Sequence, residues 1–220
     1  HTHLAENEED IAYSLEKFGV RPGQYVSELG WTGSDVWHAH CVKLDPEEIA
    51  LFARTETGVA HCPCSNCRLA SGIAPVRTML DMQVPVGLGV DGSASNDSGN
   101  LMLEARQTML LQGVAYGASA MSPQEALEIA TIGGANVLGR DDCGSLEVGK
   151  CADLVLWDMK DINAAGNWDP SAILLAGPHL ARDVFVNGKH VVENGKITTL
   201  DQRDLAIQQN HQMRALQERV

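Results

Sequence analysis

The sequence has 220 residues, of which 44% are hydrophobic and 20% charged, a composition typical of a folded globular chain rather than a disordered or fibrous one. Its 16 lysines and arginines against 29 aspartates and glutamates give a formal net charge of −13, which argues against binding to nucleic-acid polymers or anionic membranes. No apolar run approaches the roughly 20 residues of a membrane-spanning helix. Six cysteines are too few for a disulfide scaffold. We therefore expect a soluble, cytoplasmic protein with reduced thiols.

Short apolar strands alternate with helices along the first 140 residues, with strands predicted at 1–5, 36–41, 57–62 and 84–90. After the first strand, acidic residues and apolar positions at i, i+4 and i+7 predict a helix that ends at Gly19. Asp45 as N-cap and Glu48 three residues later predict a second helix through Arg54. Further helices are predicted at 75–82, 100–114 and 122–139.

The pattern changes after Cys143. Residues 152–157 are largely apolar, and two further apolar segments flank Asn187-Gly188, a dipeptide that predicts a two-residue β-hairpin. A polar helix is predicted from Asp201 onwards. We therefore predict two domains, residues 1–143 and 144–220.

The predicted elements favour an α/β fold in which four strand–helix units precede a small antiparallel β portion. A complete (β/α)8 barrel needs about 250 residues, so the first domain corresponds to half of such a barrel. The sequence begins with His1, and its first residues already have the character of a strand that carries a site. We expect the chain to start midway through a longer protein.

Each predicted strand ends in a histidine or an aspartate, namely His3, His40, His61 and Asp91. In barrel enzymes the chemistry lies at the carboxyl ends of the strands. Imidazole and carboxylate groups suit a catalytic divalent ion, which activates water, and a nearby carboxylate is then needed to carry protons. Glu6 lies just beyond His3 and is placed for that task. These residues together predict a metal-dependent hydrolytic site.

Other histidines and cysteines are weaker candidates. His1 and His38 lie deeper in their strands, each two residues before a stronger candidate and on the same predicted strand face. Isolated histidines such as His179 and His190 are expected in structural roles. The cysteines at 62, 64 and 67 contain one CxxC pair directly after a strand, and we interpret them as buried or outer-shell thiols rather than a zinc or redox site.

Five segments resemble the amidohydrolase superfamily, in its branch of mononuclear aminohydrolases that act on cytosine, guanine, S-adenosylhomocysteine and triazines. In chain order they are HLAE (3–6), AHC (39–41), HCPCSNCRLASGIAPV (61–76), GVDGSASND (89–97) and GSLEVGKCADLVLWD (144–158). The resemblance covers nearly the whole chain. It implies strands five to eight of a (β/α)8 TIM barrel for the first domain. For the second it implies the carboxyl-terminal part of a small β-sandwich and a terminal helix.

The resemblance also implies roles for the strand-end residues. His3 and Asp91 correspond to metal ligands, with His40 as a further candidate. Glu6, His40 and Asp91 correspond to catalytic residues: Glu6 shuttles protons, His40 holds the hydroxide and the substrate, and Asp91 accepts the proton of water. The implied cofactor is one divalent metal ion, zinc in the first place and Fe²⁺ as the alternative. The first metal motif of the family, an HxH pair, has no counterpart in the chain unless His1-Thr2-His3 is taken for it, and the HLAE continuation and the strands that follow argue against that assignment. Substrate-binding positions are expected at His61, Cys67, Ser95 and Asn96.

The implied reaction is hydrolytic deamination of a purine-like base. Residues 65–76 and 84–97 look most like 8-oxoguanine deaminases, which implies 8-oxoguanine as substrate and urate and ammonia as products. Guanine or S-adenosylhomocysteine aminohydrolases and triazine chlorohydrolases share the same motifs and remain alternatives, as do a binuclear amide or ester amidohydrolase and a metal-binding fragment without activity. We expect a small heterocyclic substrate, a homo-oligomeric full-length protein, and no turnover by this segment in isolation.

Overall fold

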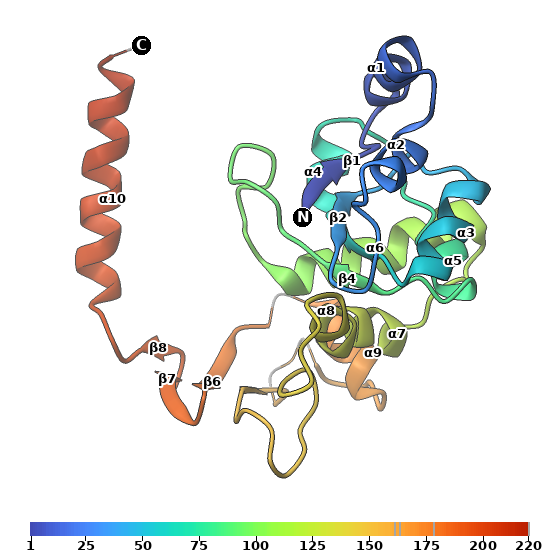
Figure 1. Ribbon diagram of the computed structural model, residues 1–220. Coiled ribbons are helices and arrows are strands. Elements are labelled where there is room, and N and C mark those ends of the chain that lie inside the picture. Colours follow the sequence, from blue (N-terminus) through green and yellow to red (C-terminus); the bar gives the residue numbers. More distant parts are fainter. Residues whose placement is uncertain (161, 163, 178, 220) are drawn as a thin grey trace. The chain divides into compact units, whose positions relative to one another are not determined.

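A computed structural model describes residues 1–160, 162, 164–177 and 179–219 (Figure 1). The chain forms two compact units. Unit 1 consists of His1–Ser145 and Asp169–Ala176, and unit 2 of Leu146–Trp168 and Gly177–Val220. The change of unit after Ser145 lies two residues beyond the domain boundary expected from the sequence. Residues 169–176, which were expected in the second domain, belong to unit 1.

Unit 1 contains a parallel four-stranded sheet, in which sequence order and spatial order agree. Its strands are β1 (Thr2–Leu4), β2 (Trp37–His40), β3 (Gly58–His61) and β4 (Val86–Leu88). The pairings Thr2↔His38, His38↔Val59 and Val59↔Val86 set a continuous register across the sheet. In the part of the chain that the structure describes, β1 and β4 are edge strands and the sheet does not close into a barrel. The predicted α/β class is confirmed.

Helices follow each strand of unit 1. They are α1 (Glu8–Phe18), α2 (Pro22–Glu28), α3 (Pro46–Thr55), α4 (Pro63–Arg68), α5 (Val76–Asp81), α6 (Leu101–Tyr116), α7 (Pro123–Glu128), the π-helical turn η1 (Ile129–Gly133), α8 (Gly134–Val137) and α9 (Pro170–Ala176). Asp45 and Glu48 form the predicted capping box of α3. The short helices α2 and α4 were not predicted from the sequence, although each begins with a proline, a residue favoured in the first helical turn.

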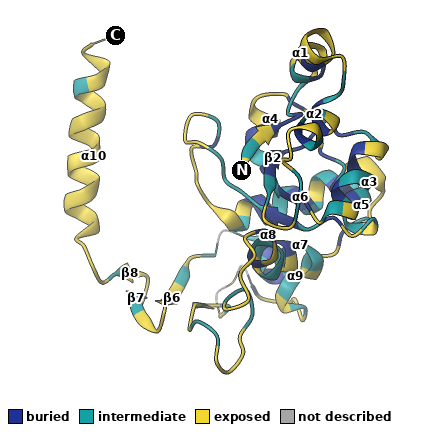
Figure 2. Ribbon diagram, in the orientation of Figure 1, coloured by how far each residue is buried: buried dark blue, intermediate teal, exposed yellow. Residues whose placement is uncertain are grey.

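The π-helical turn interrupts the helix predicted at 122–139. A side chain at Gly133 would collide with the carbonyl oxygen of Val86 in β4, so only glycine lets this turn approach the strand. The core of unit 1 gathers buried side chains of the sheet and helices, including Ile49, Phe52, Val59, Val76 and Met79. Buried positions are dark blue on the ribbon in Figure 2. This apolar core supports one face of the sheet from the helix side.

Unit 2 contains an antiparallel sheet in the order β5 (Leu154–Trp157), β6 (Ala181–Val186), β7 (Lys189–Glu193) and β8 (Lys196–Ile197). Asn187 and Gly188 form the predicted hairpin turn, with φ angles of 48° and 72°. Two positive φ angles in succession match the right-handed twist of paired strands. Helix α10 (Gln202–Gln217) begins at the predicted N-cap Asp201, and none of its described residues is buried (Figure 2). Among the described residues, no helix is long and apolar enough to cross a membrane.

Candidate active site

Three ligand-type side chains converge at the carboxyl ends of the unit 1 strands. His3 lies in β1, His40 ends β2, and Asp91 follows β4 by three residues. One ligand atom from each lies within 4.8 Å of the others. Nδ1 of His3 is 3.2 Å from Nε2 of His40, and the Asp91 carboxylate oxygens lie 4.0 Å from Nε2 of His3 and 3.9 Å from Nε2 of His40. The register of the sheet, rather than sequence proximity, brings these residues together.

Two nitrogens and a carboxylate oxygen suit zinc, which takes three protein ligands in catalytic sites. Ligands about 2.1 Å from a tetrahedral zinc ion lie about 3.4 Å apart, and one ligand atom from each of His3, His40 and Asp91 lies within 4.8 Å of the other two. The donor set therefore fits a divalent metal ion. Among the described residues, no group of cysteines has this property.

Left-handed backbone conformations occur at the ends of three strands. His40 and Asp91 have φ angles of 70° and 59°, and Ala5, directly after β1, has 49°. Non-glycine residues reach this conformation at a cost of about 1–3 kcal/mol, which the surrounding structure must offset. The left-handed turn at His40 breaks the strand alternation that would place it beside His38. His38 instead packs near Phe52, at 5.4 Å between ring centroids, and its Nε2 lies 3.1 Å from the carbonyl oxygen of Trp31.

Glu6 lies beside the same histidine. Its Oε2 is 3.7 Å from Nε2 of His40, and its Oε1 accepts a hydrogen bond from the hydroxyl of Ser71 at 3.3 Å. The Glu6 side chain is 15% exposed, so it can still be reached from solvent. The Glu6 carboxylate is thus close enough to the cluster of His3, His40 and Asp91 to exchange a proton with a group bound there, either directly or through one water molecule.

Asn66 orients the His40 ring. The amide oxygen of Asn66 lies 2.8 Å from Nδ1 of His40, so this nitrogen carries the proton and donates it. The other ring nitrogen, Nε2 of His40, then faces His3, Glu6 and Asp91. Both Asn66 and His40 are fully buried. The sequence offered one signal for Asn66, its position in the helix that directly follows β3, and this residue was not among the predicted site residues.

Two serine hydroxyls hold the Asp91 carboxylate. Ser65 and Ser95 donate to Oδ2 of Asp91 at 2.6 and 2.8 Å, while Oδ1 is the oxygen that faces His3. Burial alone would raise the pKa of Asp91, but the hydroxyls of Ser65 and Ser95, the Gly92 amide and the nearby His40 together lower it. Asp91 is therefore ionised at neutral pH. Ser65 was also missed in the sequence, because only tertiary packing brings it to Asp91.

The predicted substrate-binding residues occupy different environments. His61 is buried, neither ring nitrogen has a hydrogen-bond partner among the described residues, and burial together with His40 lowers its pKa to about 3. Asn96 is buried and donates to the carbonyl of Val90 and to Glu104. Cys67 is exposed, with its sulfur 3.6 Å from the Gln107 amide. Contact of these residues with a substrate remains a prediction.

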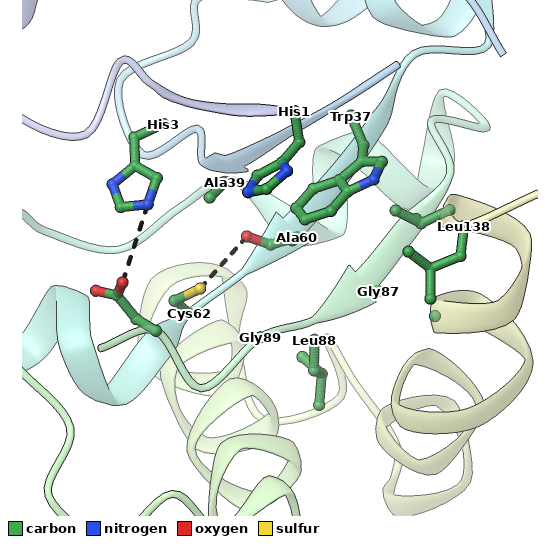
Figure 3. A pocket seen from close by; sticks show the side chains of 13 residues that line it. His1, His3, Trp37, Ala39, Ala60, Cys62, Gly87, Leu88, Gly89 and Leu138 are labelled. Carbon is green, nitrogen blue, oxygen red and sulfur yellow. Dashed lines mark hydrogen bonds and ion pairs between the residues drawn. The ribbon is translucent and has the colours of Figure 1, made fainter. Parts of the chain in front are cut away.

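A cavity of about 430 Å³ opens beside the ligand cluster (Figure 3). His1 and His3 both line it, as expected for residues on one strand face, and the His1 ring stacks on Trp37 with 4.0 Å between centroids. The remaining wall is small or apolar: Ala39, Ala60, Cys62, Gly87, Leu88, Gly89, Gly134, Val137 and Leu138, with Asp91 at the polar end. Burial raises the pKa of Cys62 to about 12, so this thiol is protonated and unreactive at neutral pH.

Residues 1–196 match the sequence profile of the Amidohydrolase family. The chain is 45% identical over 202 residues to the 8-oxoguanine deaminase of Pseudomonas aeruginosa, covering 91% of this chain and 45% of that protein. Among solved structures, a zinc-bound adenosine deaminase from Xanthomonas campestris superimposes with a TM-score of 0.94 at 33% identity, covering 99% of this chain and 50% of that one. The zinc complex of an atrazine chlorohydrolase from Arthrobacter aurescens gives 0.91 at 35% identity, covering 96% and 48%. The chain spans about half the length of these relatives.

Proposed function

The chain belongs to the amidohydrolase family, and on that premise we propose that it carries the metal-binding and proton-transferring residues of a hydrolytic deaminase for purine-like bases. The observation that carries the proposal is the convergence of His3, His40 and Asp91 with Glu6 only 3.7 Å from His40. A deaminase needs a metal site, a proton acceptor for water and a group that delivers protons to the substrate. This cluster supplies a candidate for each of these roles.

His3 and Asp91 would hold the metal ion, with His40 as a third candidate ligand. Zinc is the proposed ion and Fe²⁺ the alternative, because two imidazoles and a carboxylate suit both. When bound, such an ion lowers the pKa of a water molecule and so supplies a nucleophile at neutral pH. One ion per active site is proposed. Two ions per site would favour a binuclear amide or ester hydrolase instead.

The residues of the chain then handle the protons. Ionised Asp91 accepts a proton as the water oxygen adds to the ring carbon that bears the amino group. His40 orients the adding oxygen through Nε2, since Asn66 holds its protonated Nδ1. Glu6 protonates a ring nitrogen, and the Glu6 and Asp91 pair delivers the proton with which ammonia leaves. The net change replaces the amino group with a carbonyl oxygen, consuming one water and releasing one ammonia.

We propose 8-oxoguanine as the substrate and urate as the product, on the strength of the 45% identity to an 8-oxoguanine deaminase. The solved neighbours include an adenosine deaminase and an atrazine chlorohydrolase, so nucleosides and triazines are the alternatives. Ammonia release from a panel of amino-purines, adenosine nucleosides and triazines distinguishes them. Chloride release from a chlorotriazine would instead favour the hypothesis that the protein is a triazine chlorohydrolase.

We further propose that unit 1 represents strands five to eight of a (β/α)8 barrel and unit 2 the carboxyl-terminal part of a β-sandwich with its terminal helix. The parallel order β1-β2-β3-β4 and the high TM-scores support this proposal. Cytoplasmic location and homo-oligomerisation of the whole protein remain predictions.

The Glu6→Gln substitution in the whole protein tests the proposed role of Glu6. We expect ammonia release from 8-oxoguanine to fall by about 10²–10⁴-fold, the usual contribution of a general acid–base group, with zinc content unchanged. Glu9→Gln is the matched control, because Glu9 is an exposed carboxylate in the first turn of α1, the helix that begins two residues after Glu6. A loss of less than about tenfold for Glu6→Gln would contradict the proton-shuttle role.

A further inference from the structure

A fully buried carboxylate, Glu104, lies on α6 behind the candidate site. Its Oε2 accepts the backbone N–H of Cys64 at 3.0 Å, and its Oε1 accepts the side-chain amide of Asn96 at 2.6 Å. Both of these donors are uncharged. Burying a carboxylate against uncharged donors costs folding free energy, which points to a role of Glu104 other than stability.

One arm of Glu104 reaches the segment after β3. Cys64 lies in the first turn of α4, and the next two residues contact the site directly. Ser65 donates to Oδ2 of Asp91, and Asn66 accepts from Nδ1 of His40. The Cys64 thiol lies next to the same carboxylate: burial and the neighbouring Glu104 raise its pKa to about 12. Glu104 thus fixes the start of the short helix that holds two site residues.

The other arm reaches the loop after β4. Asn96 donates both to Glu104 and to the carbonyl oxygen of Val90, at 2.6 and 2.8 Å. Its neighbour Ser95 donates the second hydroxyl to Oδ2 of Asp91. The two carboxylate oxygens of Glu104 therefore connect α4 with the loop after β4. Each of these segments supplies one serine, Ser65 or Ser95, that donates to Oδ2 of Asp91.

We propose that Glu104 is a positioning residue that sets the Ser65 and Ser95 hydroxyls on Oδ2 of Asp91 and so directs Oδ1 towards His3. The inference rests on the proposed metal site. Carboxylate ligands are oriented by hydrogen bonds from outer groups, and such groups work best when a rigid element carries them. Helix α6, with 16 residues, is that element.

Glu104→Gln tests the role while keeping the size of the side chain. A carboxamide has one acceptor oxygen and one NH₂ group that can only donate, so its NH₂ group must face either the Cys64 N–H or the Asn96 amide, and one arm is lost. We expect the dissociation constant for zinc, measured on metal-free whole protein by chelator competition, to rise by about 10-fold or more. The visible spectrum of the Co²⁺-loaded protein should change in parallel, because the ligand geometry at Asp91 changes.

Glu48→Gln is the matched control. Glu48 is also a buried carboxylate in unit 1; it accepts backbone N–H groups of Gly23 and Asp45 at 2.7 and 2.9 Å, and unlike Glu104 it also pairs with the guanidinium of Arg21 at 2.9 Å. Its loss should lower the thermal midpoint of the metal-free protein as Glu104→Gln does, yet leave the dissociation constant for zinc unchanged. Equal effects of the two variants on zinc binding would show that Glu104 serves stability alone.

A second route applies if Glu104→Gln fails to fold. Asn96→Ala removes only the arm that reaches the β4 loop and should raise the zinc dissociation constant severalfold. Where both single variants fold, Ser95→Ala should raise that constant less in the Glu104→Gln background than in the wild type, because both act through Asp91. Additive effects would contradict the proposed route.

The failure of this inference is distinguishable from failure of the proposed function. Wild-type protein that binds no zinc would refute both. Wild-type protein that binds zinc, with Glu104→Gln and Asn96→Ala binding it within about twofold of wild type, would refute only the positioning role of Glu104.

Discussion

Each unit holds an aspartate beside a histidine, and the two pairs differ in their separation and in the origin of the other groups that contact the aspartate. In unit 2, Oδ1 of Asp183 lies 3.0 Å from Nε2 of His190. In unit 1, Oδ1 of Asp91 lies 4.0 Å from Nε2 of His3. The tighter pair is the one within a single hairpin, and the looser one belongs to the candidate metal site. Close approach therefore does not by itself identify a functional carboxylate.

The two aspartates also differ in where their hydrogen-bond and ion-pair partners come from. Asp183 accepts from its neighbour Arg182, from the backbone of Asn194 and from His190, all within or next to the β6–β7 hairpin. Asp91 gathers partners from β1, β2, α4 and its own loop. The hairpin carboxylate is neutralised locally by an arginine. The Asp91 carboxylate is held by hydroxyls, which leave its negative charge available for a cation.

The largest expected difference between the units concerns their cores. Phe52 of unit 1 is fully buried, and Phe52→Ala should destabilise that unit by about 3–5 kcal/mol. Phe185 of unit 2 is partly exposed and stacks on His190 at 4.3 Å, so Phe185→Ala should cost only about 0.5–1.5 kcal/mol. Amide hydrogen exchange in β2 and β3, compared with β6 and β7, measures the two effects separately. Similar costs would show that unit 2 is as well packed as unit 1.

The next effect concerns metal binding by the two aspartates. Asp91→Asn should weaken zinc binding by at least about 100-fold, more than the loss of an outer hydrogen-bond partner, because it removes a ligand charge. Asp183→Asn should leave zinc binding unchanged, since its partners lie within the hairpin. Chelator competition on the metal-free protein measures both. Zinc affinity that survives Asp91→Asn would remove Asp91 from the ligand set.

The smallest effect is a pH dependence confined to unit 2. The hydrogen bond from Arg182 lowers the pKa of Asp183. A carboxyl group with a lowered pKa stabilises the fold above its unfolded pKa of about 3.9, and that stability is lost as the pH falls through the folded value. The protection factors of amides in β6 and β7, corrected for the intrinsic exchange rate at each pH, should therefore fall below about pH 4. Asp183→Asn should abolish this dependence, and an unchanged pH profile in that variant would assign it to another group.

Local rules in the sequence account for much of the fold. Capping at Asp45, the hairpin at Asn187-Gly188 and the apolar strands all depend on residues a few positions apart, and each appears where predicted. The short helix α4 and the π-helical turn were not predicted, because their few residues are shaped by packing against neighbouring elements. The left-handed backbone at His40 also overrides the strand alternation that grouped His40 with His38.

The sequence by itself determined that imidazoles and carboxylates end successive parallel strands, because strand periodicity and residue type are local properties. These local properties predict that His3, Glu6, His40 and Asp91 lie at one edge of a sheet. Only the tertiary structure decided which donors meet those groups. Ser65 and Asn66 reach Asp91 and His40, and Glu104 ties their segment to the β4 loop, because long-range strand pairing and helix packing set contacts that no local pattern encodes.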